Sequence, residues 1–148
     1  METIFDKATR DNLIGRINLL DENSKAQWGK MNIYQMLKHC TVYEEMMLGK
    51  NVYQRVFLGR LFGKMALKEF TQDDTPIKRN VPTLTQLKIK ETSGDVIAEK
   101  KKWISLLEEH AKFSNTEIVH SFFGNLTKEQ VGCLVYKHTD HHLRQFNH

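Results

Sequence analysis

Three histidines stand in five positions near the end of the sequence, in the stretch HTDHHLRQF at residues 138–146. Helical residues four apart lie on one face about one turn apart, so His138 and His142 point the same way. This spacing lets both imidazole rings reach one metal ion, at about 2.0–2.1 Å for zinc. Alone, the pair is a weak indication of a metal site because it often occurs by chance.

A third histidine, His39, lies on the inward face of another expected helix, which Met36 and Tyr43 help to define. Several buried imidazoles each need a hydrogen-bond partner, and one metal ion satisfies all of them. We therefore favour a metal site formed by His39, His138 and His142 over three core histidines that are hydrogen-bonded separately.

Three neutral nitrogen donors leave a divalent ion with its full charge and an open coordination position, which is typical of catalytic rather than structural sites. Such an ion lowers the pKa of bound water toward about 7, or deprotonates a bound thiol. The first property suits hydrolysis and the second suits thiol transfer.

Two further side chains in the stretch HTDHHLRQF are candidates for supporting roles. His141 lies on the flank of the apolar stripe that Val131, Leu134 and Val135 define on the expected helix. It is the best candidate for proton transfer, with a surface histidine as the alternative. Gln145 lies on the inward stripe, where it would orient a ligand or a bound water, with core hydrogen bonding as the alternative. Glu44 and Asp140 lie away from the inward faces, so neither is expected to be the general acid or base.

The other chemically capable side chains are predicted to be structural. Cys40 and Cys133 have no neighbour placed to activate them, so we interpret them as small core residues. His110, His120 and His148 share no helical face and are expected to be exposed to solvent.

Apolar residues recur with the helical period in four stretches, which predicts four helices. The stripes are Leu13, Ile17 and Leu20; Met36, Val42, Tyr43, Met46 and Met47; Ile97, Ile104, Leu107 and Ala111; and Val131, Leu134, Val135 and Phe146. Start signals accompany three of the helices. The expected caps are Asn32 with Gln35 reaching back, Thr127 with Gln130 reaching back, and Asp95.

A stretch of about 45 residues, from Gly49 to Gly94, separates the second and third helices, which is long for a connection inside a compact domain. Part of it, YQRVFLGRLFGKMALKEF, has a helical pattern that Gly59 and Gly63 interrupt. A four-helix bundle with parallel second and third helices needs such a crossover. We therefore predict an all-α four-helix bundle with a long crossover, as a single domain over residues 1–148.

Composition narrows the class of protein. The 148 residues are 40% hydrophobic and 27% charged, which is ordinary for a soluble globular protein. No apolar run approaches the roughly 20 residues of a membrane span, and METIFDKATRDN has no signal-peptide pattern. Because the cysteines form no spacing motif, we expect a cytoplasmic protein.

The net charge of +4 makes a basic nucleic-acid-associated protein a third and least favoured class. The densest basic stretch is Lys100–Lys102, with Lys88 and Lys90 upstream. Acidic residues lie between and around these lysines, and no aromatic residues are interleaved to stack on bases. A solvated helix face is the favoured interpretation, so nucleic acid is not expected as a partner.

The histidine arrangement resembles the DinB/YfiT-like superfamily of metalloproteins. The matching positions are His39 in MLKHC and His138, His142 and Gln145 in KHTDHHLRQF. The stretches WGKMN and FFGNLTKEQ are similar to a branch of this superfamily known only as a domain of unknown function. The resemblance follows nearly the whole chain in helix order, although its specific motifs occupy a minor part of it.

This resemblance implies a bundle with one divalent metal, usually zinc or nickel, held by His39, His138 and His142, and often a homodimer. Some relatives are S-transferases that use low-molecular-weight thiols, and others resemble hydrolases. The expected function is therefore a metal-dependent hydrolase or thiol S-transferase with a small-molecule substrate. The alternative is a non-catalytic bundle that binds a metal or a small ligand.

Overall fold

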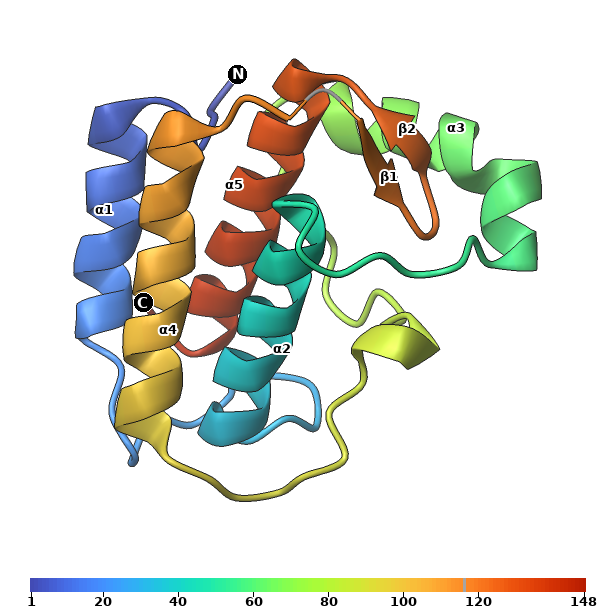
Figure 1. The fold of residues 1–148 in the computed structure, drawn as a ribbon. Helices are drawn as coiled ribbons and strands as arrows, with labels where there is room; N and C mark the ends of the chain where they lie inside the picture. Colours follow the sequence, from blue (N-terminus) through green and yellow to red (C-terminus); the bar gives the residue numbers. More distant parts are fainter. Residues whose placement is uncertain (116) are drawn as a thin grey trace.

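Helices make up most of the computed structural model, which describes residues 1–115 and 117–148 (Figure 1). In these residues the α-helices are α1 (Lys7–Asn18), α2 (Ile33–Met47), α3 (Phe57–Thr71), α4 (Val96–Glu109) and α5 (Lys128–Gln145). There are also two 3-10 turns, η1 (Thr85–Leu87) and η2 (His110–Lys112), and an antiparallel pair of strands, β1 (Ile118–His120) and β2 (Gly124–Leu126). The prediction of a mainly helical protein is confirmed, and the short hairpin is an addition that the helical pattern did not indicate.

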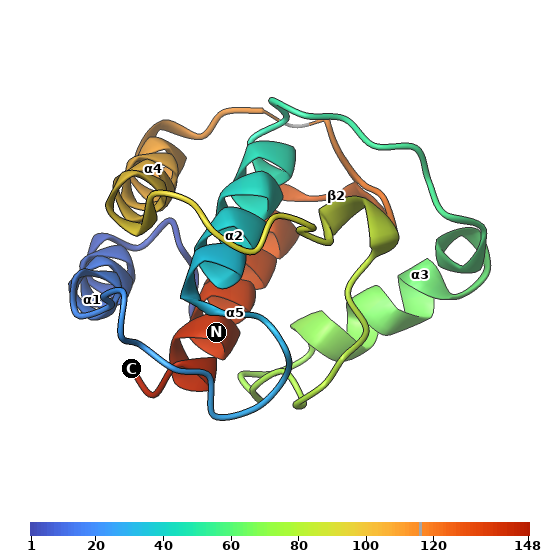
Figure 2. The same cartoon turned by 90° about the horizontal axis from the view of Figure 1, so that it is seen from below.

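Helices α1, α2, α4 and α5 pack together, whereas α3 lies to one side of them (Figure 1, Figure 2). Helix α1 contacts α4 and α5, and α2 contacts the same two helices. Helix α3 contacts α5 and β2. The core between the packed helices includes Leu13, Ile17, Met36, Leu37, Met47, Trp103, Leu107, Leu134 and Val135.

The predicted apolar stripes agree with the buried faces of α1, α2 and α5 but not fully with that of α4. Ile97, which the α4 stripe included, is 55% exposed, and Trp103, which it omitted, is fully buried. The buried face of α4 follows Val96, Trp103 and Leu107. The indole removes the largest apolar area from water, so it decides which side of the helix turns inward.

The predicted helix caps are present. Asn32 Oδ1 accepts the N–H of Gln35 at 2.9 Å, while Gln35 Oε1 accepts the N–H of Asn32 at 3.2 Å. Thr127 and Gln130 form the same reciprocal pair at the start of α5. Asp95 caps α4. These bonds satisfy N–H groups that have no partner inside the helix.

Gly59 and Gly63 do not interrupt α3, contrary to the sequence prediction. A Cβ on either residue would overlap the carbonyl oxygen of Phe122, so these glycines form the face by which α3 docks on the β1–β2 turn. Leu67 is the large apolar side chain of α3 that is buried, and most of the others lie on the outer side of the helix. The exposed ones are Phe57, Leu58, Leu61, Phe62 and Met65.

The packed helices carry charged side chains on their outer surface. Within the basic stretch Lys100–Lys102, Lys100 Nζ donates to the carbonyl of Leu20 at 2.8 Å, and Lys102 pairs with Glu45 at 2.6 Å. These contacts support the interpretation of a solvated helix face. In the described part of the chain, no helix has both the length and the apolar character needed to cross a membrane.

Candidate metal centre

His39 from α2 and His138 and His142 from α5 lie together, as the sequence predicts. One ring nitrogen of each lies within 4.8 Å of the others. The ring centroids are 5.1 Å apart for His39 and His138, 4.9 Å for His39 and His142, and 4.6 Å for His138 and His142. His39 and His142 are buried and His138 is half-buried. The three rings form a cluster with the composition of a metal site.

Hydrogen bonds at the outer nitrogens orient two of these rings. His39 Nδ1 donates to the carbonyl of Leu87 at 2.9 Å, and His142 Nδ1 donates to Gln145 Oε1 at 2.8 Å. Gln145 is held in turn because its Nε2 donates to the carbonyl of Trp28 at 2.8 Å. A neutral imidazole has one proton, so the Nε2 of each ring carries a lone pair. Metal-ligating histidines are generally supported in this way.

The third ring completes a donor set that fits a small divalent ion. His138 Nε2 lies 3.1 Å from His39 Nε2. Two nitrogens bound tetrahedrally at zinc distances would be about 3.3 Å apart, close to this separation. The Nδ1 of His138 is buried without a hydrogen-bond partner in the described residues, and the ring stacks on Tyr43 at a centroid distance of 3.7 Å.

Burial keeps the three rings neutral. It is the largest cause of a lowered pKa at His39 and of pKa values well below the ordinary one at His138 and His142. The neighbouring imidazoles add to the effect, because a second positive charge in the cluster would be repelled. All three rings are therefore available as neutral donors at neutral pH.

His141 lies outside the cluster of His39, His138 and His142. Its Nδ1 is 3.3 Å from the carbonyl of Ile77, and its ring meets Trp28 edge-on. It is 8% exposed, so it is not a surface histidine. Its ring centroid is 5.1 Å from that of His142, which places it beside the centre. Proton transfer by His141 remains a prediction.

The prediction that His110 and His120 are exposed is wrong. Both are buried, at 1% and 4% exposure. His110 Nε2 lies 2.8 Å from Oε2 of Glu44, which is also fully buried. Burial raises the pKa of Glu44, and the hydrogen bond with His110 opposes that rise. A helical wheel treats each helix alone, so it could not show that the end of α4 supplies a partner for a carboxyl group on α2.

His120 is a residue near the centre that the sequence did not reveal. Its ring stacks on Phe123 at 4.5 Å and faces Tyr43 at 6.2 Å, and Tyr43 stacks on His138. Its Nδ1 accepts the N–H groups of Phe122 and Phe123 at 3.1 and 3.2 Å. The ring proton of neutral His120 therefore lies on Nε2. Only a prediction of the hairpin could have placed this residue.

We expect His120 to make the protein less stable in mild acid. Burial lowers its pKa to about 4, so below pH 6.5 the unfolded chain takes up a proton that the folded chain does not. The stabilisation is complete above about pH 6.5 and is lost as the pH falls toward 4, by about 3 kcal/mol in total. Urea unfolding of the wild type and His120→Gln at pH 7 and pH 4.5 measures this contribution.

The wild type should lose about 2–3 kcal/mol more than His120→Gln between these two pH values. The other buried histidines titrate in both proteins and cancel in the comparison. His148→Gln serves as the control, because His148 is only half-buried. Equal losses in the wild type and His120→Gln would contradict the assignment.

Residues 5–148 match a family described as a protein of unknown function (DUF1569). No curated protein and no solved structure matches the chain. The expected domain of unknown function is confirmed, whereas the relation to the DinB/YfiT-like superfamily rests on the sequence motifs. Because the family description assigns no activity, the three-histidine cluster is the feature from which a function can be inferred.

Proposed function

We propose that the chain, which belongs to the DUF1569 family of unknown function, is a metal-dependent enzyme that acts on a small molecule. His39, His138 and His142 would hold one divalent ion, with zinc and nickel as the leading candidates. The observation that carries this proposal is the convergence of one nitrogen from each ring within 4.8 Å. A bound ion would supply a Lewis acid that activates water or a thiol, so hydrolysis and thiol S-transfer are the reaction classes.

The chain's own residues would orient the centre and shield it. The Leu87 carbonyl and Gln145 hold the rings of His39 and His142. The connection between α2 and α4 passes beside the centre, because the carbonyl of Ile77 contacts His141. His141 is our candidate for moving a proton to or from a substrate.

We also propose that the fold is a DinB-like four-helix bundle. The ring of contacts among α1, α4, α2 and α5 supports this, and α3 and η1 occupy the connection expected to cross over the fold. A homodimer belongs to the same proposal, since it follows from the resemblance in the sequence motifs. The cytoplasmic location that we propose rests instead on the absence of a cysteine spacing motif.

One observation favours a second candidate, a metal-binding protein without catalysis. The carboxyl groups close to the ligands in sequence are already engaged. Glu44 pairs with His110, and Asp140 pairs with Arg16 at 3.0 Å and Arg144 at 3.1 Å. His141 is then the main remaining acid or base beside the cluster.

Metal analysis followed by activity assays separates these functions. Protein purified without a metal-affinity column is expected to contain about one zinc or nickel ion per chain, and His142→Ala to contain much less. The metal-loaded wild type is then assayed with ester, amide and phosphoester substrates, and with an electrophile plus a low-molecular-weight thiol. Turnover that His142→Ala lacks supports the enzyme.

Metal binding without turnover in either assay would favour the binding protein. A wild type that takes up no divalent metal would contradict both functions. His141→Ala adds a separate test, because it should retain the metal and lose turnover if His141 transfers a proton.

A further inference from the structure

A cavity of about 580 Å³ lies between α3 and the β1–β2 hairpin. Its lining includes four basic side chains, Arg55, Arg60, Lys64 and Lys68, and no acidic one. Within the described residues, none of these four forms an ion pair. The three histidines do not line the cavity, so it is separate from the candidate metal centre. Its volume is within the range of small-molecule sites.

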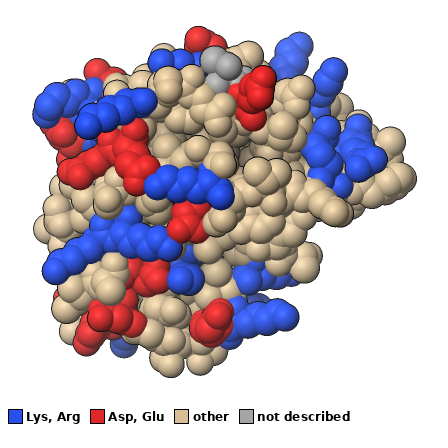
Figure 3. Space-filling view, in the orientation of Figure 1, with Lys and Arg blue, Asp and Glu red and all other residues tan. Residues whose placement is uncertain are grey.

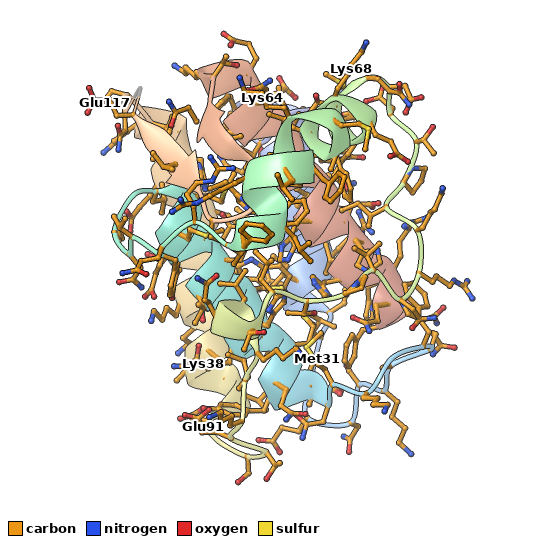
Figure 4. All side chains as sticks on the ribbon, turned by 90° about the vertical axis from the view of Figure 1, so that its right-hand side faces the viewer. Met31, Lys38, Lys64, Lys68, Glu91 and Glu117 are labelled. Atoms are coloured by element: carbon orange, nitrogen blue, oxygen red, sulfur yellow. The ribbon has the colours of Figure 1, made fainter. Side chains whose placement is uncertain are left out.

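The cavity concentrates positive charge on one part of the surface. Figure 3 shows lysine and arginine side chains over α3, on the right of the view, with no acidic side chain visible among them on this face. The acidic residue of α3, Glu69, does not line the cavity and lies 4.0 Å from Lys78. Lys64 and Lys68 are four residues apart and lie on the same side of the helix, and Figure 4 labels both on α3. Like charges around a concave surface repel one another and focus an electrostatic field that attracts anions.

Backbone hydrogen bonds hold Arg55 in place in the lining of this cavity. Its Nη2 donates to the carbonyls of Gly59 at 2.8 Å and Phe122 at 3.2 Å. These neutral acceptors position the guanidinium group and leave its charge uncompensated. The Nε of Arg55 is buried without a partner in the described residues. A Cβ on Gly124, whose φ is +88°, would come within 2.9 Å of Nη1, so this glycine makes room for the group.

Two amide side chains add neutral donors to the lining. Gln130 Oε1 accepts the N–H of Thr127 at 2.9 Å, which leaves the NH2 group of Gln130 able to donate elsewhere. Asn125 lines the cavity from β2. Two guanidinium groups, two ammonium groups and amide donors around one space are suited to bind phosphate oxygens.

We propose that this cavity binds a small anionic ligand that carries one or more phosphate groups. The bound group would lie among Arg55, Arg60, Lys64 and Lys68. Two sources share this chemistry. One is a soluble phosphate compound, and the other is the headgroup of an anionic phospholipid, since the outer side of α3 next to the cavity exposes Leu61, Phe62 and Met65.

Calorimetric titration with pyrophosphate tests the shared chemistry. The probe is added to the wild type and to Arg60→Gln, Lys64→Gln and Lys68→Gln, whose side chains are exposed and whose loss should not affect folding. Each substitution removes a charge-assisted interaction and should weaken binding about tenfold. Lys101→Gln on α4 is the matched control and should bind like the wild type. Added salt should weaken the binding of all these proteins.

Further experiments distinguish a soluble phosphate compound from a phospholipid headgroup, and the cavity from the candidate metal centre. Co-sedimentation with phosphatidylcholine vesicles, with and without phosphatidylglycerol, assigns the lipid source if only the anionic vesicles bind and Lys64→Gln weakens the binding. Pyrophosphate binding without vesicle binding assigns the soluble source. Binding in either arm should persist in His142→Ala, and metal content should be unchanged in Lys64→Gln. The proposal is overturned if neither probe binds the wild type, or if the three cavity variants bind as the wild type does.

Discussion

Replacing His142 by alanine is expected to remove most of the thermal stabilisation that zinc or nickel gives the wild-type protein. A ligand that binds only the folded state at 1,000 times its Kd adds about 4 kcal/mol, or about 10 °C in Tm for a chain of this size. Losing even a supporting group around a metal commonly costs about 10–100-fold in affinity. A 100-fold loss would reduce the stabilisation to about 1.4 kcal/mol. Thermal melts over a series of metal concentrations measure this response.

His39→Ala and His138→Ala should behave like His142→Ala, because each removes one of the three converging nitrogens. His141→Ala is the matched control on the same helix and should keep the wild-type response. Gln145→Ala should reduce the response partially, since it removes only the acceptor that orients His142. The site would be wrong if His141→Ala lost the response while His138→Ala retained it.

The pH dependence of this metal response should follow the lowered pKa values of the ligands. Protons compete with a metal ion for imidazole nitrogens. Because burial lowers the pKa of His39, His138 and His142, protonation begins below the ordinary histidine value of 6.5. The metal response should therefore persist at pH 6.5 and disappear only at lower pH.

His110→Ala is expected to destabilise the protein by about 3–5 kcal/mol, because it removes one partner of a fully buried pair. His110 is the closest partner of Glu44, because its Nε2 lies 2.8 Å from Glu44 Oε2. The side chains of Thr139 and Trp103 lower the pKa of Glu44 to a smaller extent. The loss is a large fraction of the 5–15 kcal/mol that stabilises a typical domain. Urea unfolding measures the change in the free energy of unfolding. In a thermal melt, the expected fall in Tm is about 10 °C or more.

Two comparisons test the physical cause of that loss. Glu44→Gln keeps the size of the side chain and can still hydrogen-bond His110, so it should cost clearly less than His110→Ala. Glu109→Ala breaks an exposed pair with Lys50, whose side chains are 44% and 46% exposed, and should change stability by less than about 1 kcal/mol. Equal losses in the free energy of unfolding for His110→Ala and Glu109→Ala would show that the buried pair stabilises the protein no more than the exposed pair does.

The sequence alone identified the three histidines that lie together and the starts of the helices that carry them. The relative directions of His138 and His142 follow from the period of the helix, which is a local property. The starts of α2 and α5 follow from Asn32 and Thr127, because a capping box needs only residues three apart. Local geometry is the same wherever the helix lies in the fold, so these predictions did not require the tertiary structure.

Only the tertiary structure decided which other side chains contribute. His110 meets Glu44 across 66 residues, and His120 depends on a hairpin with strands of three residues, too short for a periodic signal. The cationic cavity arises because Gly59 and Gly63 let α3 approach the hairpin, which brings Arg55 against Gly124. Such contacts depend on how two distant elements are placed against each other, and no residue spacing within one element encodes that placement.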